Sequence, residues 1–226
     1  MMSHTSPIAQ NIEARTHGRF LVRVPAVGPP WPVLVGFHGY AEAAGDHLDA
    51  LQTIPGIDEW LVVSIQALNR FYTRSNRVVA SWMTREDREL AIADNIDYIG
   101  RVLTLVRDAY RTSEPLVFAG FSQGAAMAYR AAAHYRADAL IVLAGDVPPD
   151  VIEDHPMPIP PVLIGRGTRD DWYTEAKEAA DRAALTQVDA QAHVCVFEGG
   201  HEWTDSFRDA AATVLRGVKS REAARR

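Results

Sequence analysis

A serine between two glycines is the first feature of this sequence with a chemical meaning. Residues 116–127 read Leu-Val-Phe-Ala-Gly-Phe-Ser-Gln-Gly-Ala-Ala-Met, a G-x-S-x-G pattern around Ser122. An apolar run precedes the pattern and an Ala-rich stretch follows it, so the serine stands where a strand would turn sharply into a helix. Such a turn exposes the hydroxyl, and Gly120 and Gly124 leave room for it. The pattern predicts that Ser122 is a nucleophile and that the following helix directs its positive end toward an oxyanion.

A serine hydroxyl is a weak nucleophile near neutral pH and needs a base within hydrogen-bond reach. The sequence has eight histidines, and His201 is the best placed of them. It follows the apolar run His193–Phe197 after Glu-Gly-Gly, at the carboxyl end of a predicted strand. Catalytic groups of parallel sheets gather at those ends. We therefore expect His201 to be the base.

The third group should orient His201 and stabilise its charged form. Asp170 and Asp171 follow the apolar run Pro161–Ile164, and Asp146 follows an earlier run. The chain order Ser, Asp, His is the order that hydrolases with this type of serine turn use. All three aspartates fit this order. We favour Asp170, while Asp171 and Asp146 remain alternatives, and Asp171 is equally suited to cap the next helix.

An acyl-transfer site also needs backbone N–H groups that hold the oxyanion. Gln123, directly after the nucleophile, supplies one such group. The second is expected from the loop after an early strand, where the N–H of Tyr40 follows Phe37-His38-Gly39. We expect the side chain of His38 to brace this loop rather than to react.

The elements that must position these residues alternate along the chain. Short runs rich in Val, Ile and Leu predict buried parallel strands at Pro32–Phe37, Leu61–Gln66, Leu116–Ala119, Ala139–Leu143, Pro161–Ile164 and His193–Phe197. Helical patterns lie at Glu86–Tyr110, Gln123–His134, Thr174–Gln187 and Asp205–Val218. Strands that alternate with helices predict an α/β fold with a mostly parallel central sheet and helices on both faces.

The segment from Ala67 to Arg85 follows neither the helical nor the strand period. We expect a long loop on the substrate side of the sheet, since long loops in compact domains are often functional. Trp82 and Met83 in this segment, together with Trp172 and Trp203, are candidates for an acyl pocket.

Length, composition, net charge and cysteine count limit the classes of protein to which this chain can belong. A chain of 226 residues, 47% apolar and 23% charged, fits one globular domain over residues 1–226. A net charge of −6 without a massed basic face excludes nucleic acid as the expected partner, and the basic tail Lys219–Arg226 fits a solvated helix end. Cys195 is the single cysteine, so we expect no disulfide and no thiolate metal cluster. No leader or long apolar segment is apparent, which predicts a cytoplasmic protein without stable membrane insertion.

Four motifs together resemble the phospholipase/carboxylesterase family of α/β-hydrolases, which includes acyl-protein thioesterases and small bacterial carboxylesterases. They are Phe37-His38-Gly39, the stretch Gly-Phe-Ser-Gln-Gly-Ala at 120–125, Gly-Thr-Arg-Asp at 167–170, and Gly-Gly-His-Glu-Trp at 199–203. They lie in the family's order and span about 165 residues. The resemblance implies the α/β-hydrolase fold, Asp170 rather than Asp171 as the triad acid, and an oxyanion N–H from Gln123.

The sequence departs from that family at several positions. Ala41-Glu42 stands where Gly-Asp is usual, Arg166 where His is frequent, and Trp172-Tyr173 where a smaller apolar pair follows the acid. We expect the triad to survive these changes, but the family's substrates do not carry over.

The sequence thus predicts a serine carboxylesterase, thioesterase or lysophospholipase-like hydrolase that acts on a small-molecule ester or thioester without metal or organic cofactor. Two alternatives remain: a peptidase or other C–X bond hydrolase on the same fold, and a non-catalytic binding protein that kept it. The sequence leaves open whether the chain forms a homodimer.

Overall fold

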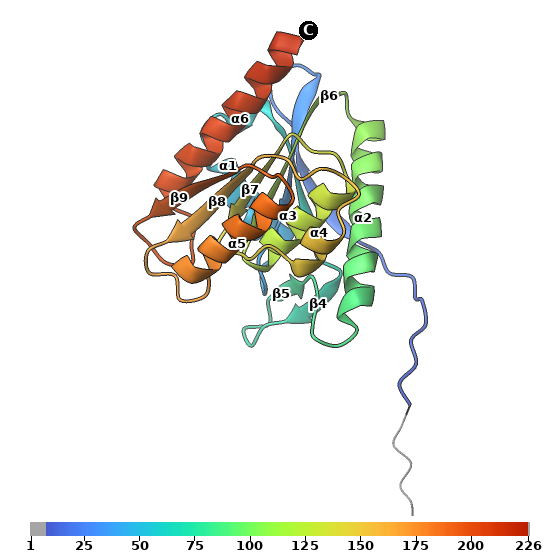
Figure 1. Cartoon of the computed structure of the whole chain (residues 1–226). Coiled ribbons are helices and arrows are strands. Elements are labelled where there is room, and N and C mark those ends of the chain that lie inside the picture. The colour runs from blue at the N-terminus through green and yellow to red at the C-terminus, as the bar shows by residue number, and fades with distance from the viewer. Residues whose placement is uncertain (1–7, 226) are drawn as a thin grey trace, which may run out of the picture.

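The computed structural model describes residues 8–225, and within them one sheet contains seven strands in the order β1-β3-β2-β6-β7-β8-β9 (Figure 1). Strand β1 runs antiparallel to β3, and every other neighbouring pair is parallel. The strands are β1 (Arg19–Arg23), β2 (Trp31–Phe37), β3 (Leu61–Gln66), β6 (Thr112–Phe121), β7 (Ala139–Leu143), β8 (Val162–Gly167) and β9 (Ala192–Phe197). The predicted parallel sheet is confirmed.

The central strands form where the sequence is apolar on both faces of the chain. In β3 and β7 every residue is buried, as is expected for strands covered by helices on both sides. The predicted boundaries hold within a few residues, with the largest difference in β6. That strand begins at Thr112 rather than Leu116, because Thr112 pairs with Trp31 before a register shift that leads to the pair Leu116–Val33.

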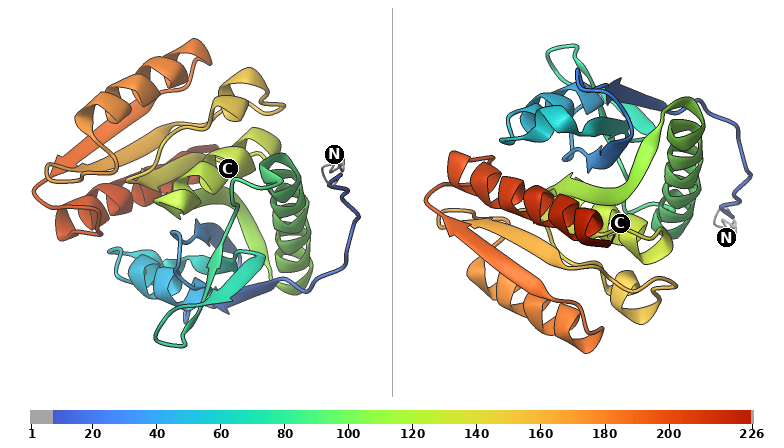
Figure 2. Two further views of the ribbon diagram at one scale, coloured as in Figure 1. Left: turned by 90° about the horizontal axis from the view of Figure 1, so that it is seen from below. Right: turned by 90° about the horizontal axis from the view of Figure 1, so that it is seen from above.

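Helices cover both faces of the sheet, as Figure 2 shows. They are α1 (Ala44–Gln52), α2 (Arg88–Ala109), α3 (Gln123–His134), α4 (Pro149–Glu153), α5 (Glu175–Gln187) and α6 (Asp205–Arg225). Helices α1 and α6 lie on one face, where the ring of Trp203, just before α6, contacts both His47 of α1 and Phe207 of α6. Helices α2, α3, α4 and α5 cover the other face.

The strand register brings the carboxyl ends of the parallel strands to one edge. Phe37 of β2 pairs with Gly120 of β6, and Gly120 pairs with Val142 of β7. Val142 in turn pairs with Ile164 of β8, which pairs with Val194 of β9. The loops after these strands therefore meet at the same edge, although they are far apart in the sequence.

The segment 67–85 differs from the irregular loop that we expected. It contains an antiparallel hairpin of β4 (Asn69–Tyr72) and β5 (Val78–Ser81), closed by a turn in which Asn76 has a φ of 62°. The hairpin also pairs with the loop after β2, through a bridge between Ala80 and Glu42. Alternation is hard to recognise in strands of four residues, and the pairing partner lies elsewhere in the sequence.

The C-terminal basic tail continues α6 as far as Arg225. Lys219 in this part of the helix forms an ion pair with Glu59. Within residues 8–225, none of the helices combines the length and the apolar character needed to cross a membrane.

Candidate active site

Ser122 lies at the sharp turn between β6 and α3 that the G-x-S-x-G pattern predicts. Its backbone has φ 54° and ψ −120°, a conformation that costs energy for a residue with a side chain. The surrounding structure holds the turn in place, because Ser122 N–H donates to Leu143 O at 2.9 Å and Ala125 N–H donates to Ser122 O at 3.0 Å. Backbone hydrogen bonds thus hold Ser122, the candidate nucleophile, in this conformation.

The two glycines of the pattern are required by close backbone approaches. A Cβ on Gly120 would lie 2.3 Å from Gly124 O, and a Cβ on Gly124 would lie 2.0 Å from Phe37 O. Both distances are far below van der Waals contact, and in both cases the obstacle is backbone. Any side chain at these positions would push α3 away from β6 and β2.

His201 and Asp170 form the hydrogen bond that a triad requires. Nδ1 of His201 lies 2.8 Å from Oδ2 of Asp170, whose side chain is fully buried. The other carboxylate oxygen accepts the N–H groups of Trp172 and Tyr173 at 2.8 and 2.9 Å. Because Nδ1–H of His201 donates to the carboxylate, Nε2 of the neutral imidazole carries no proton and can accept a hydrogen bond.

The alternative aspartates occupy other places. Asp171 is exposed, and Asp146 forms an ion pair with Lys177 at 3.1 Å. Of the three candidates, Asp170 is therefore the one that the structure brings to His201.

Ser122 and His201 come together at one cavity of about 590 Å³. Both side chains line it, and the imidazole of His201 packs against the ring of Phe121, the residue before the serine, with a centroid distance of 5.0 Å. Tyr40 and Gln123 line the same cavity. The predicted nucleophile, base and oxyanion residues therefore share one site at the carboxyl edge of the sheet.

The loop that carries Tyr40 is braced from several directions. His38 is completely buried, with Nδ1 2.7 Å from Gly39 O and Nε2 3.0 Å from the N–H of Ala67. Because Nε2 must accept from Ala67, the proton lies on Nδ1, which donates to Gly39 O. Burial lowers the pKa of His38, which keeps this arrangement neutral. The bracing role predicted for His38 is confirmed.

The Gln123 side chain ties the start of α3 to the segment after the hairpin. Its Oε1 accepts the N–H of Trp82 at 2.9 Å, and its Nε2 donates to Met83 O at 3.1 Å. The backbone N–H of Gln123 belongs to the first turn of α3, where N–H groups have no partner within the helix. This N–H and the N–H of Tyr40 are the two groups that the sequence predicts for an oxyanion hole.

Comparisons of the sequence with protein-family models and with curated proteins find no match. Solved structures are similar in fold. Esterase PE8 is 24% identical with a TM-score of 0.69, covering 89% of this chain and 98% of its own. A Bacillus cereus carboxylesterase is 17% identical with a TM-score of 0.70, covering 89% and 94%. Zea mays acyl-protein thioesterase 2 is 17% identical with a TM-score of 0.67, covering 89% and 99%.

This chain has the α/β-hydrolase fold. The sheet order, the parallel register and these neighbours agree on it. The neighbours are also consistent with the resemblance to the phospholipase/carboxylesterase family that the sequence motifs carry.

The aromatic and Met candidates for an acyl pocket fall into two groups. Trp172 lines the cavity and is 76% exposed. Trp82 and Met83 are buried in the core instead, and Trp82 donates its Nε1–H to His38 O at 2.8 Å. Trp203 is half-buried between α1 and α6. We therefore correct the prediction for Trp82, Met83 and Trp203, because neighbouring elements enclose these side chains away from the cavity.

Sequence reasoning missed one wall of the cavity. The loop from β7 to α4 supplies Val147 and Pro148, α4 supplies Pro149, and α2 supplies Arg88. The Pro-rich stretch after β7 was visible in the sequence, but it gave no indication of which face it would cover. Within residues 8–225, no group of three or more His, Cys, Asp and Glu side chains is placed to hold a metal ion.

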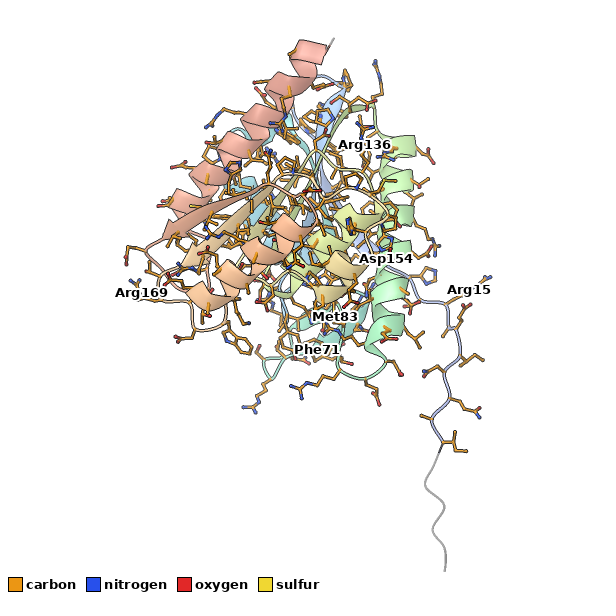
Figure 3. All side chains as sticks on the ribbon, in the orientation of Figure 1. Arg15, Phe71, Met83, Arg136, Asp154 and Arg169 are labelled. Carbon is orange, nitrogen blue, oxygen red and sulfur yellow. The ribbon has the colours of Figure 1, made fainter. Side chains whose placement is uncertain are left out.

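Figure 3 shows how the segments around the site lie in the molecule. Arg169, next to Asp170, and Phe71 and Met83 of the hairpin segment are labelled toward its lower part. Helix α6 begins at the left of the view, beside β9, and extends to its upper end.

Proposed function

We propose that the protein is a serine hydrolase that cleaves carboxylic esters or thioesters through an acyl-enzyme on Ser122. The observation that carries this proposal is the 2.8 Å contact of His201 Nδ1 with buried Asp170, at a cavity that Ser122 also lines. The esterase and thioesterase neighbours support ester hydrolysis over other reactions of the fold.

In the first half-reaction, Nε2 of His201 accepts the Ser122 hydroxyl proton as the serine oxygen attacks the substrate carbonyl carbon. The carbonyl oxygen becomes an oxyanion, which accepts hydrogen bonds from the N–H groups of Tyr40 and Gln123. The positive end of α3 adds to this stabilisation. Collapse of the tetrahedral intermediate breaks the bond to the alcohol or thiol, which takes the proton from His201.

In the second half-reaction, water enters where the leaving group was. Nε2 of His201 accepts a proton from the water, whose oxygen attacks the acyl carbon. The proton then returns to the serine oxygen as the acid departs. Throughout, the carboxylate of Asp170 holds the ring and stabilises its charged form.

The direct test replaces Ser122. We expect Ser122→Ala to lower the turnover of p-nitrophenyl acetate by about 10⁴–10⁶-fold and to abolish labelling by a fluorophosphonate probe. Ser220→Ala is the matched control, because Ser220 is exposed on α6 and bonds only to Arg216 O among described residues. Full activity in Ser122→Ala would remove this residue from the mechanism.

The same assay with aminoacyl p-nitroanilides tests the peptidase alternative. A higher kcat/KM for these amides than for esters of matched acyl groups would contradict the assignment as an esterase. Absence of both turnover and probe labelling in the wild-type protein would favour the non-catalytic alternative.

A further inference from the structure

Some of the charged side chains that line the cavity form ion pairs and others do not. Lys177 and Asp146 neutralise each other through their 3.1 Å ion pair. Arg88, the first residue of α2, also lines the cavity, but within residues 8–225 its side chain forms neither an ion pair nor a hydrogen bond. The cavity lining therefore includes a guanidinium that has no ion-pair or hydrogen-bond partner among residues 8–225.

Asp150, a carboxylate on which the charge of Arg88 acts, is already paired with another arginine. Both oxygens of Asp150 accept from the buried Arg130, at 2.7 and 2.8 Å. Burial raises the pKa of Asp150, but the hydrogen bond and charge of Arg130 outweigh this, and the charge of Arg88 lowers the pKa further. Arg130 and Arg88 therefore both act on the carboxylate of Asp150, and only Arg130 hydrogen-bonds to it.

An apolar path connects this charge to the nucleophile. Arg130 follows Ser122 by eight residues, so its Cα lies about 12 Å further along α3, and its guanidinium pairs with Asp150. Ala126 of α3, Val147 and Pro148 of the facing loop, and Pro149 at the start of α4 line the same cavity as Ser122 and Arg88. A chain attached to Ser122 that follows this wall has apolar contacts along its length and approaches the charge at its end.

Of the two parts of an ester substrate, the acyl chain is the one that would follow this path, and the leaving group would lie elsewhere. The leaving group must lie beside His201, which protonates it, and His201 follows β9. Arg88 belongs to α2, which lies on the other side of α3 from β9 and α5 in both Figure 1 and Figure 2. The acyl chain therefore extends away from His201 and toward Arg88.

We propose that Arg88 forms a subsite for an anionic group, so that the preferred substrates are esters whose acyl chain ends in a carboxylate. This inference rests on the proposed function, because it places the acyl group on Ser122. It goes beyond that function in naming the substrate class and the residue that selects it.

The test compares p-nitrophenyl hydrogen suberate with p-nitrophenyl octanoate, which has the same chain length without the terminal carboxylate. Arg88 is exposed, so its interaction is partly screened by solvent. We expect Arg88→Gln to lower the suberate-to-octanoate ratio of kcat/KM by roughly fivefold to tenfold, leaving octanoate turnover within about twofold. Higher salt should lower the wild-type ratio toward that of the variant.

Arg85→Gln is the matched control, since Arg85 is an exposed arginine nearby that does not line the cavity. Loss of the same charge there should leave the ratio unchanged. An unchanged ratio in Arg88→Gln, or an equal fall in both variants, would overturn the proposal.

A binding experiment separates this proposal from the proposed function. In a Ser122→Ala background, calorimetric titration with monomethyl suberate and with methyl octanoate measures recognition without turnover. We expect monomethyl suberate to bind more tightly than methyl octanoate, and Arg88→Gln to abolish this difference. That result would support the subsite even if no ester were hydrolysed. Equal binding of the two esters, or binding of neither, would overturn it.

Discussion

Glu42 controls the loop that presents the N–H of Tyr40. Its Oε2 accepts the N–H of Gly39 at 2.7 Å, and its own N–H donates to Gly39 O at 3.3 Å, so the loop closes around Tyr40. Between them Ala41 has a φ of 60°, which is unfavourable for a residue with a side chain. Burial raises the pKa of Glu42, while the hydrogen bond from Gly39 and the charges of Arg77 and His201 act in the opposite direction. This carboxylate is therefore a positioning group that offsets the strain at Ala41.

Replacing Glu42 should change turnover more than substrate binding. We expect Glu42→Ala to lower the kcat for p-nitrophenyl acetate by about tenfold with little change in KM, because a misplaced Tyr40 N–H weakens the oxyanion hole. Glu42→Gln keeps an oxygen acceptor for Gly39 and should retain most of the activity. Equal losses in both variants, or an effect confined to KM, would contradict the positioning role.

At the scale of elements, the site depends on how closely α3 approaches the strands. Gly120 and Gly124 let the first turn of α3 pack directly on the backbones of β6 and β2. The ion pair of Arg166 and Glu178, 2.9 Å long and nearly buried, similarly joins β8 to α5 near the loop that carries Asp170. The Arg at 166, a departure from the family pattern, thus has a structural partner on α5.

A methyl group at residue 124 should test this packing. We expect Gly124→Ala to lower the free energy of unfolding by about 2 kcal/mol and to remove most esterase activity, because the new Cβ would overlap Phe37 O. Gly217→Ala is the control, since a Cβ there meets nothing closer than 3.7 Å and replaces a helical glycine. Urea unfolding and kcat/KM measure both effects, and a fully active, equally stable Gly124→Ala protein would refute the account.

At the scale of the whole molecule, Asp181 of α5 links two loops that form the cavity. It accepts the N–H of Val147 at 3.1 Å and the hydroxyl of Tyr173 at 2.7 Å. Burial, the largest influence, raises the pKa of Asp181 from 3.8 to about 6, with a further increase from Asp146. The folded state therefore binds this proton more tightly than the unfolded state does.

This difference predicts a pH dependence of stability. Between about pH 4 and pH 6 the folded protein holds more protons at Asp181 than the unfolded chain, so this contribution falls as the pH rises. Asp181→Asn keeps an acceptor for Val147 and lacks the charge. We expect the stability of Asp181→Asn relative to wild type to increase from pH 4 to pH 7 in urea unfolding experiments. A difference that stays constant over this range would show that Asp181 does not titrate as described.

Local patterns in the sequence were enough for the nucleophile turn and for the general architecture. The G-x-S-x-G stretch, an apolar run and an Ala-rich helix are contiguous, so Ser122 and its glycines could be assigned without tertiary information. Asp170 and His201 could be placed because parallel strands bring the loops at their carboxyl ends to one edge. The structure adds the hydrogen bond that distinguishes Asp170 from Asp171.

What the tertiary structure decided depends on contacts between distant segments. An aromatic residue in a sequence gives no indication of which neighbours enclose it. The sequence therefore could not separate Trp82 and Trp203, which are packed among other elements, from Trp172, which lines the cavity. The hairpin at 69–81 and the charged end at Arg88 depend likewise on partners in other elements. The sequence by itself determined the chemistry available at Ser122, whereas the shape and charge of the cavity arise only when separate loops pack against one another.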